Sequence, residues 1–201
     1  MTEERRIYAA YDDEGVYVYQ AFKPTIVKAA LENKTFGRGF NLERMTWIKP
    51  SFAWMLYRSG YATKTRQEAI LKIKLSHDGF LSILRESVET SYNPRVYESA
   101  DDWRITLKKS AVRHQWDPER YLTLGKHPTR RAIQIGIRGW VVQKYVSEWI
   151  IGLEEVTALA HEIKEAKEQK KDFPSVPEER VYEVDDELVR RLGITGTIDE
   201  Q

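Results

Sequence analysis

Branched aliphatic residues occupy alternate positions in two segments of the chain, 69–75 and 131–137. They are Leu71, Ile73 and Leu75 in the first segment and Ile133, Ile135 and Ile137 in the second. Because successive side chains of a strand point to opposite faces, each segment predicts a strand with one buried face. Gln134 is therefore expected on the face opposite the isoleucines, toward solvent or a cleft.

Shorter apolar runs predict further strands. Residues 6–11 and 16–22 flank the turn-forming residues 12–15 and favour a hairpin, although 16–22 also suits a helix that continues past Lys23. Residues 44–48, 103–107 and 111–116 are expected to be strands. Residues 117–120 begin with Asp-Pro and are expected to form a turn.

Helices are expected where proline precedes an apolar face and glycine follows it. A helical face of Ile26, Val27, Ala30 and Leu31 follows Pro24 until the glycine-containing residues 37–39 break the pattern, and residues 51–58 follow Pro50 and close at Gly60. Residues 157–171 predict a charged amphipathic helix. Residues 173–177 are expected to be a linker, and 185–192 a last short helix.

These elements predict an α+β fold rather than a doubly wound parallel sheet, because regular strand-helix-strand repeats are few. We expect a single domain over residues 1–172, with a largely antiparallel, possibly split, β-sheet flanked by helices. Residues 173–201 are expected to be a linker and C-terminal tail that carries the short helix.

Composition removes several classes of chemistry. The chain has no cysteine, which excludes disulfides, thiolate metal ligands and a cysteine nucleophile, and its four histidines are too dispersed for a local metal motif. No metal is therefore expected. No apolar run approaches the roughly 18 residues that cross a bilayer, and no signal-peptide stretch follows the polar N-terminus. We expect a cytoplasmic protein with no membrane partner.

Charge is unevenly distributed although the net value is only +1. Residues 101–140 hold nine Lys and Arg against four Asp and Glu. Both a positive face for an anionic ligand and a solvated mixed surface fit this pattern.

Residues 44–58 concentrate Arg, Trp, Tyr and Lys at the expected strand-to-helix junction. Free N–H groups at a helix N-terminus favour a phosphate or carboxylate, and Lys49 and Ser51 lie where they add donors. Trp47 or Trp54 suits stacking on a base or a nicotinamide ring. The alternative is structural, with the tryptophans packed in the core and Lys49 and Arg58 solvated.

Four residues outside this segment are further candidates. Arg6 and Tyr11 lie near an expected strand end, and Arg131 and Gln134 interrupt an apolar strand. Phosphate-binding and dinucleotide-binding glycine loops, the zinc-protease motif and the serine-hydrolase elbow are all absent from the sequence.

Several strings carry a family resemblance: Arg6-Ile-Tyr-Ala-Ala-Tyr-Asp12, Val18-Tyr-Gln-Ala-Phe22, Arg44-Met-Thr-Trp-Ile-Lys-Pro-Ser-Phe52, Tyr57-Arg-Ser-Gly60, Gln115-Trp-Asp-Pro-Glu-Arg120 and Arg131-Ala-Ile-Gln-Ile-Gly136. Together they resemble the family catalogued as domain of unknown function 4291, over almost the whole chain. The family brings no established activity.

The order of elements also resembles, more distantly, the ADP-ribosyltransferase superfamily. Its members place an Arg or His on an early strand, a Ser, Thr or Tyr before a helix, and a Gln or Glu on a late strand, around a split sheet that binds NAD. The resemblance assigns these roles to Arg6 or Arg44, to Thr46 or Ser51, and to Gln134. The sequence departs from the pattern at the late acid, since Ile135 and Gly136 follow Gln134.

This resemblance implies an NAD-dependent transferase acting on a nucleic-acid or protein acceptor. Arg44 and Lys49 would hold the NAD pyrophosphate, Trp47 or Tyr11 would stack on nicotinamide, and Gln134 would orient a hydroxyl group. Arg6, Arg58 and Arg131 complete the expected set of NAD-binding residues.

Two other classes of function remain open. A non-catalytic module that binds RNA or DNA would use the basic residues 101–140 and tryptophan stacking. A scaffold that docks another protein would use the charged helix of residues 157–171.

Overall fold

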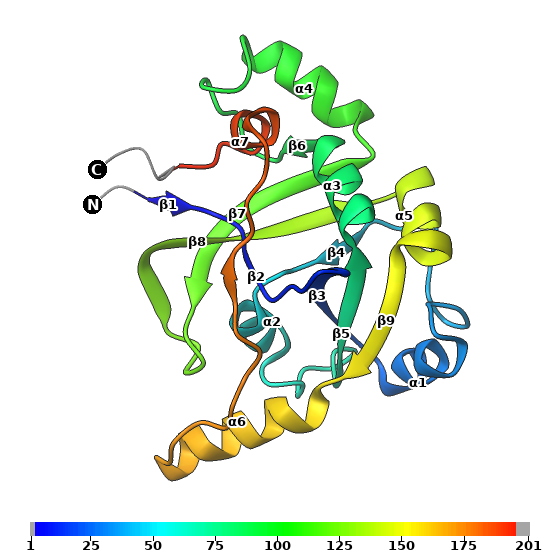
Figure 1. Ribbon diagram of the computed structural model, residues 1–201, viewed down its shortest axis with the longest axis vertical. Coiled ribbons are helices and arrows are strands. Elements are labelled where there is room, and N and C mark those ends of the chain that lie inside the picture. The colour runs from blue at the N-terminus through cyan, green and yellow to red at the C-terminus, as the bar shows by residue number, and fades with distance from the viewer. Residues whose placement is uncertain (1–2, 196–201) are drawn as a thin grey trace.

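Two hydrogen-bonded sheets form the centre of the chain, which the computed structural model describes for residues 3–195 (Figure 1). The larger sheet contains β1 (Glu4–Arg5), β4 (Thr46–Ile48), β6 (Ser87–Glu89), β7 (Val112–Arg120) and β8 (Lys126–Ile137). Its order is β1-β8-β7-β6, with β4 also pairing β8. The smaller sheet has the order β3-β5-β9, from β3 (Gly15–Phe22), β5 (Ala69–Ser76) and β9 (Ile150–Glu155). A separate ladder joins β2 (Tyr8–Ala9) to β10 (Arg180–Val181).

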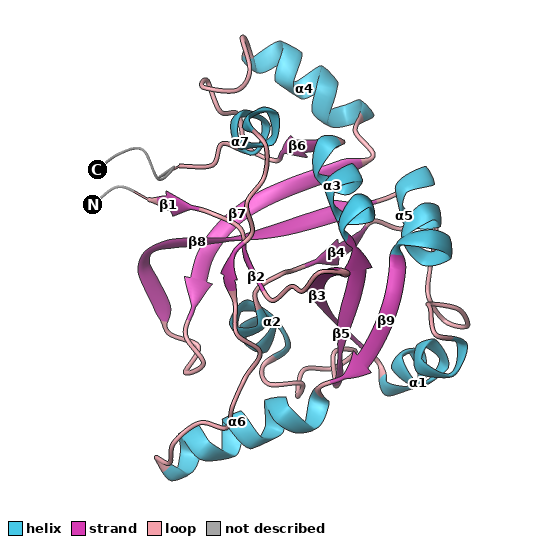
Figure 2. Cartoon of the chain, viewed as in Figure 1, coloured by secondary structure: helices cyan, strands magenta, loops and turns pink. Residues whose placement is uncertain are grey.

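Helices surround these sheets (Figure 2). They are α1 (Pro24–Asn33), α2 (Phe52–Ser59), α3 (His77–Arg85), α4 (Ala100–Lys109), α5 (Trp140–Lys144), α6 (Thr157–Gln169) and α7 (Asp186–Leu192), with a π-helical turn η1 (Tyr145–Trp149) after α5. Pairing is antiparallel except between β1 and β8 and between β6 and β7. The predicted α+β class, with largely antiparallel sheets flanked by helices, is confirmed.

The two alternating segments form central strands, as predicted. Ile133, Ile135 and Ile137 of β8 are buried, whereas Gln134 between them is only partly buried on the other face. In β5 the aliphatic residues are buried and the lysines between them are partly exposed. Burial of one face therefore fixes the register of both strands.

A short bridge links the two sheets beside the predicted strand-to-helix junction. The N–H of Tyr19 in β3 donates to the carbonyl of Lys49 at 2.7 Å, and the N–H of Lys49 donates back at 3.3 Å. Lys49 lies between β4 and α2. This bridge holds the junction of residues 44–58 at the place where the two sheets meet.

Local signals specify α2. The hydroxyl oxygen of Ser51 accepts the N–H of Trp54 at 3.0 Å as an N-cap, and Gly60 ends the helix in the left-handed conformation at φ 59°. Phe52, Met55 and Leu56 are buried against the core. The predicted helix and its limits are confirmed.

Three expectations about local structure are wrong. Residues 103–107 belong to helix α4, not to a strand; Ser99 caps α4, acids occupy its first turn and lysines its last. The segment suggested a strand because Trp103, Ile105 and Leu107 occupy alternate positions, whereas in α4 Trp103 and Leu107 are partly buried one turn apart. Residues 6–11 do not form a regular hairpin with 16–22: β2 pairs with β10, and only Tyr11 bridges to Val16.

Residues 117–120 continue strand β7 and do not form a turn; the chain reverses at residues 121–125 instead. Pro118 has no backbone N–H to donate. It is tolerated because β6 pairs with β7 only up to His114, and beyond His114 that edge of β7 has no neighbouring strand to accept a hydrogen bond. This change places the side chains of residues 115–120 on the faces of a sheet.

The chain beyond residue 172 packs against the rest of the molecule. The predicted short helix is present as α7, capped by Asp185, and its Leu188 and Leu192 are fully buried in the main core. Tyr182 also lies in this core and packs edge-on against Tyr11. Residues 196–201 of the predicted tail lie outside the described residues.

Candidate functional site

One face of the larger sheet gathers polar and aromatic residues from three strands. Trp47 of β4 pairs with Gly136 of β8, and Gln134 of β8 pairs with Gln115 of β7. The opposite face of the same strands carries the buried isoleucines. We call the polar side, defined by Trp47, Gln115, Asp117 and Gln134, the Gln134 face.

The Trp47 ring and the Met45 sulfur lie over β8 where position 136 has no side chain. A Cβ atom at Gly136 would come within 2.7 Å of the Met45 sulfur and within 3.0 Å of the Trp47 ring. This is also the side on which Gln134, two residues earlier, presents its side chain. Glycine therefore admits the partly buried indole to the Gln134 face.

Two amides hold a carboxylate at the centre of this face. The Nε2 of Gln115 donates to Oδ1 of Asp117 at 2.8 Å, and the Nε2 of Gln134 donates to Oδ2 of Asp117 at 2.8 Å. Both carboxylate oxygens are engaged, which fixes the orientation of Asp117. An oriented, partly buried carboxylate can stabilise a positive charge that develops near it.

Lys49 lies next to Trp47 of this face and is 7% exposed. Its Nζ donates to the carbonyl of Trp47 at 3.2 Å and lies 5.4 Å from the centroid of the Trp54 ring. The pKa of Lys49 is lowered to about 7. Burial is the main cause and the charge of Arg58 adds to it, whereas the charge of Asp117 opposes the shift.

An aromatic and cationic surface continues from Trp54 along α2. Trp54 packs edge-on against Tyr57, which is 37% exposed. The guanidinium of Arg120 lies 3.7 Å from the Tyr57 ring centroid, and Nζ of Lys64 lies 5.8 Å from it. This arrangement is typical of a stacked cation–π pair.

Ser51 and Thr46, predicted as catalytic, are engaged in hydrogen bonds within the fold. Ser51 caps α2 and donates its hydroxyl proton to Oε1 of Glu119 at 2.7 Å. The hydroxyl oxygen of Thr46 accepts from Gln20, which in turn accepts from the buried Tyr145. A catalytic role for either stays a prediction.

The N-terminus of α2 is occupied by the chain's own carboxylates, contrary to the expected phosphate site. The N–H of Phe52 donates to Oε1 of Glu179 at 2.7 Å, and Glu119 accepts from Ser51. The pKa of Glu179 is raised to about 8. Burial is the main cause, the N–H of Phe52 opposes the shift, and the charge of Glu119 adds to it. Burial also raises the pKa of Glu119.

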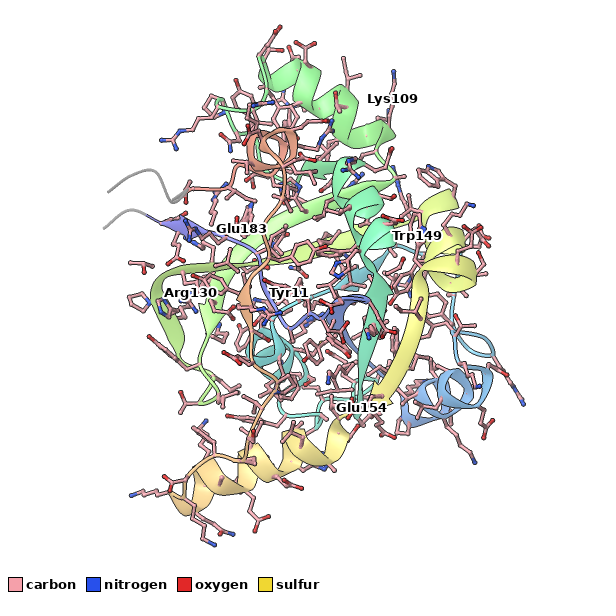
Figure 3. All side chains as sticks on the ribbon, in the orientation of Figure 1. Tyr11, Lys109, Arg130, Trp149, Glu154 and Glu183 are labelled. Carbon is pink, nitrogen blue, oxygen red and sulfur yellow. The ribbon has the colours of Figure 1, made fainter. Side chains whose placement is uncertain are left out.

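Several predicted residues lie away from the Gln134 face or at its margin. The hydroxyl of Tyr11 donates to the carbonyl of Val181, and the Arg180 guanidinium covers its ring at 4.1 Å. Figure 3 labels Tyr11 near the middle of the view. Arg131 forms an ion pair with Glu3. Arg6 is partly buried between β1 and β2, and Arg44 is exposed before β4.

The basic residues of 101–140 do not form one continuous patch. Because Val112 pairs with Ile137 and Arg120 with Lys126, the β7–β8 hairpin carries basic residues toward both of its ends, which lie roughly 25 Å apart. Figure 3 shows this separation, with Lys109 at the end of α4 and Arg130 far across the view on β8. The guanidinium of Arg130 covers the Tyr8 ring at 3.9 Å.

Sequence reasoning missed Gln115 and Asp117 as site residues because 117–120 was interpreted as a turn. The spacing of these residues was the available signal. Gln115 and Asp117 are two residues apart, so in a strand they lie on one face, and the chain reversal at 121–125 brings that face beside Gln134. Glu119 and Glu179 carried no local signal, since 60 residues separate them.

The other features of the described chain lie away from the predicted site residues. A surface cavity of about 900 Å³ lies between β1, residues 89–96 and residues 189–195, and none of the residues predicted from the sequence lines it. Among residues 3–195, no group of three or more His, Asp or Glu residues is arranged to hold a metal ion. No helix in this part of the chain is long and apolar enough to cross a membrane.

The molecule is thus an α+β domain with two main sheets and a partly buried carboxylate held between two glutamines on one sheet face. The chain belongs to the family described as domain of unknown function DUF4291, whose sequence model matches residues 6–182. A comparison with curated proteins gave no match. The family assignment confirms the resemblance seen in the sequence.

Proposed function

We propose that the chain is an NAD-dependent, ADP-ribosyltransferase-like enzyme that acts on a nucleic-acid or protein acceptor, and that the Gln134 face binds NAD. The observation that carries the proposal is the Asp117 carboxylate, held by Gln115 and Gln134 at 2.8 Å each. It supplies, from β7, the acid that the sequence of β8 lacks.

The chemistry asked of Asp117 is electrostatic. When the bond between nicotinamide and ribose breaks, its electron pair leaves with nicotinamide and positive charge develops on the ribose. A fixed carboxylate beside the ribose stabilises that charge without having to reorient. The acceptor's oxygen or nitrogen then bonds to the same ribose carbon and releases its proton.

The surrounding residues support binding of an anionic, aromatic molecule. Trp47 offers a partly exposed indole for nicotinamide stacking, and Gln134 places its amide beside the reacting carboxylate. Arg58 and Arg44 are exposed guanidinium groups suited to a pyrophosphate. Lys49 is less suited to that role because it is buried and its pKa is near neutrality.

Thermal unfolding with NAD and with ADP-ribose tests the binding step. A ligand at 100 times its Kd stabilises the folded state by about 2.7 kcal/mol and so raises the Tm. We expect this rise for the wild type and for Asp13→Asn, an exposed control, and a reduced rise for Gln134→Ala. No rise with either ligand for the wild type would contradict the proposal.

A specific surface favours a second candidate, a module that binds single-stranded nucleic acid. Tyr57, Arg120 and Lys64 combine an exposed ring with two cations, the combination that stacks bases and neutralises phosphates. Tyr57→Ala is then expected to weaken binding of a short RNA, and Tyr92→Ala, at 38% exposure, is the matched control. RNA binding that is insensitive to salt and to Tyr57→Ala would exclude this candidate.

A further inference from the structure

Lys49 is a buried amine with little to stabilise a positive charge. Of its possible hydrogen bonds, the described chain supplies one, to the carbonyl of Trp47 at 3.2 Å. Trp54 adds a ring face at 5.4 Å. A buried ammonium group with so few partners is unstable relative to the neutral amine.

The charges around Lys49 come from two elements and leave it without an ion pair. Arg58 of α2 repels a proton on Lys49, and Asp117 of β7 attracts one. No carboxylate within residues 3–195 lies within 4.0 Å of the Lys49 amine. Both oxygens of Asp117 are already engaged by Gln115 and Gln134.

Lys74 shows the opposite arrangement in the same molecule. Its side chain is 12% exposed, but its amine pairs with Asp12 at 2.9 Å and with Glu14. These carboxylates raise the pKa of Lys74 above its usual value. Lys49 therefore differs from Lys74 in two ways: burial dominates its pKa, and it has no paired carboxylate to offset that burial.

We propose that Lys49 is a nucleophilic amine that forms a Schiff base with an aldehyde or ketone carried by an anionic small molecule. The lone pair on Nζ attacks the carbonyl carbon, and the carbonyl oxygen takes up a proton to become a hydroxyl. The amine then loses a proton, water leaves, and an imine remains. Water accepts the amine proton and protonates the departing hydroxyl, since both oxygens of Asp117 are engaged by glutamines.

Arg58 determines the class of substrate. Its guanidinium is exposed on α2 one helical turn after Trp54, whose ring lies 5.4 Å from the Lys49 amine, so Arg58 lies on the same side of α2 as that amine and its charge opposes a proton there. A phosphate bound by Arg58 would hold a carbonyl within the same region. Phosphorylated sugars and nucleotide sugars with a free aldehyde share this chemistry. The proposal goes beyond the transferase activity and does not depend on NAD.

Reductive trapping tests the proposal on the full chain. The protein is incubated with pyridoxal 5′-phosphate, ribose 5-phosphate, ADP-ribose or propanal, reduced with borohydride, and mapped by peptide mass spectrometry. Near pH 7 about half of Lys49 is neutral, against about one in 3,000 for an ordinary lysine. We expect pyridoxal 5′-phosphate to label Lys49 at least about tenfold faster than Lys74.

The controls keep the result interpretable. Lys49→Arg should lose the rapid labelling and Lys144→Arg should keep it. If Lys49→Arg does not fold, the pH profile of the wild type decides, with half-maximal labelling of Lys49 expected near pH 7. Faster labelling by ribose 5-phosphate than by ADP-ribose assigns a sugar phosphate, and the reverse assigns a nucleotide sugar.

Three results would overturn the proposal. In the first, Lys49 stays unlabelled while exposed lysines react; in the second, Lys49 reacts only above about pH 9, like an ordinary amine. In the third, propanal labels Lys49 as fast as pyridoxal 5′-phosphate, which would show that a phosphate on the carbonyl compound does not contribute to binding. None of these measurements involves NAD, so failure here is distinguishable from failure of the transferase activity.

Discussion

Glu179 makes the stability of this fold depend on pH in a direction opposite to that of an ordinary ion-paired carboxylate. Its folded-state pKa is raised from 4.5 to about 8, chiefly by burial. Between these values the folded protein keeps a proton that the unfolded chain has released. Stability associated with Glu179 is therefore present below pH 4.5 and is lost as pH rises to about 8.

The size of the effect follows from the shift. A difference of about 3.5 pKa units at about 1.4 kcal/mol each gives a loss of up to about 5 kcal/mol. Glu179→Gln removes the titration but keeps an oxygen to accept the N–H of Phe52, now at 2.7 Å. We expect the variant to match the wild type near pH 4 and to exceed it by an amount that grows toward pH 8.

Two other buried groups also make the stability of the wild type depend on pH, so the wild-type pH profile alone does not isolate the contribution of Glu179. Burial lowers the pKa of His114 to about 3 and that of Lys49 to about 7. Each stays neutral in the folded state while the unfolded chain binds a proton, so each makes stability rise with pH up to the unfolded value, 6.5 or 10.5. The difference between variant and wild type cancels both contributions.

The assay is urea unfolding followed by circular dichroism, from about pH 4 to about pH 9. Glu178→Gln, at an exposed neighbouring position, is the matched control and should leave the profile unchanged. A difference between Glu179→Gln and wild type that is constant with pH, or that shrinks as pH rises, would refute the reasoning.

Three further substitutions test the packing around the site. Ser51→Ala should destabilise the protein by about 1–2 kcal/mol in urea unfolding through loss of the α2 cap, and an unchanged midpoint would contradict the assigned cap. Gly136→Ala should displace the Trp47 ring, seen as a shift in tryptophan fluorescence, at a loss of about 1–3 kcal/mol; an unshifted spectrum would contradict the packing of Trp47 on β8. Leu188→Ala should lower stability by about 2–5 kcal/mol, and Glu187→Ala far less; equal effects would show that α7 contributes little to the core.

The sequence predicted the parts of the fold that strong local patterns specify. Alternation fixed β5 and β8, and proline, serine and glycine fixed the limits of α2. Helix α4 was predicted as a strand because Trp103, Ile105 and Leu107 alternate with polar residues, a pattern typical of a strand. The β2–β10 pairing escaped because it joins Ala9 to Arg180, a contact between distant segments that no local pattern encodes.

The candidate site was predicted in part. Trp47 and Gln134 lie on one sheet face, and Lys49 and Arg58 lie next to it, because the strand-to-helix junction and the late strand are neighbours in the larger sheet. Asp117 was assigned to a turn because Asp-Pro pairs favour turns, whereas the edge of β7 accommodates proline within a strand. Arg131 and Tyr11 were expected near the others, but ion pairing and the C-terminal strand hold them elsewhere.

Nicotinamide release from NAD tests the central claim most directly. It is measured for the wild type, Asp117→Asn and Asp13→Asn, in the presence of RNA and protein acceptors. We expect release by the wild type and by Asp13→Asn, and a rate at least about one hundred times lower for Asp117→Asn, because the fixed charge beside the ribose is lost. Absence of release by the wild type, or equal rates for wild type and Asp117→Asn, would contradict the assignment of the Gln134 face as the site of this reaction.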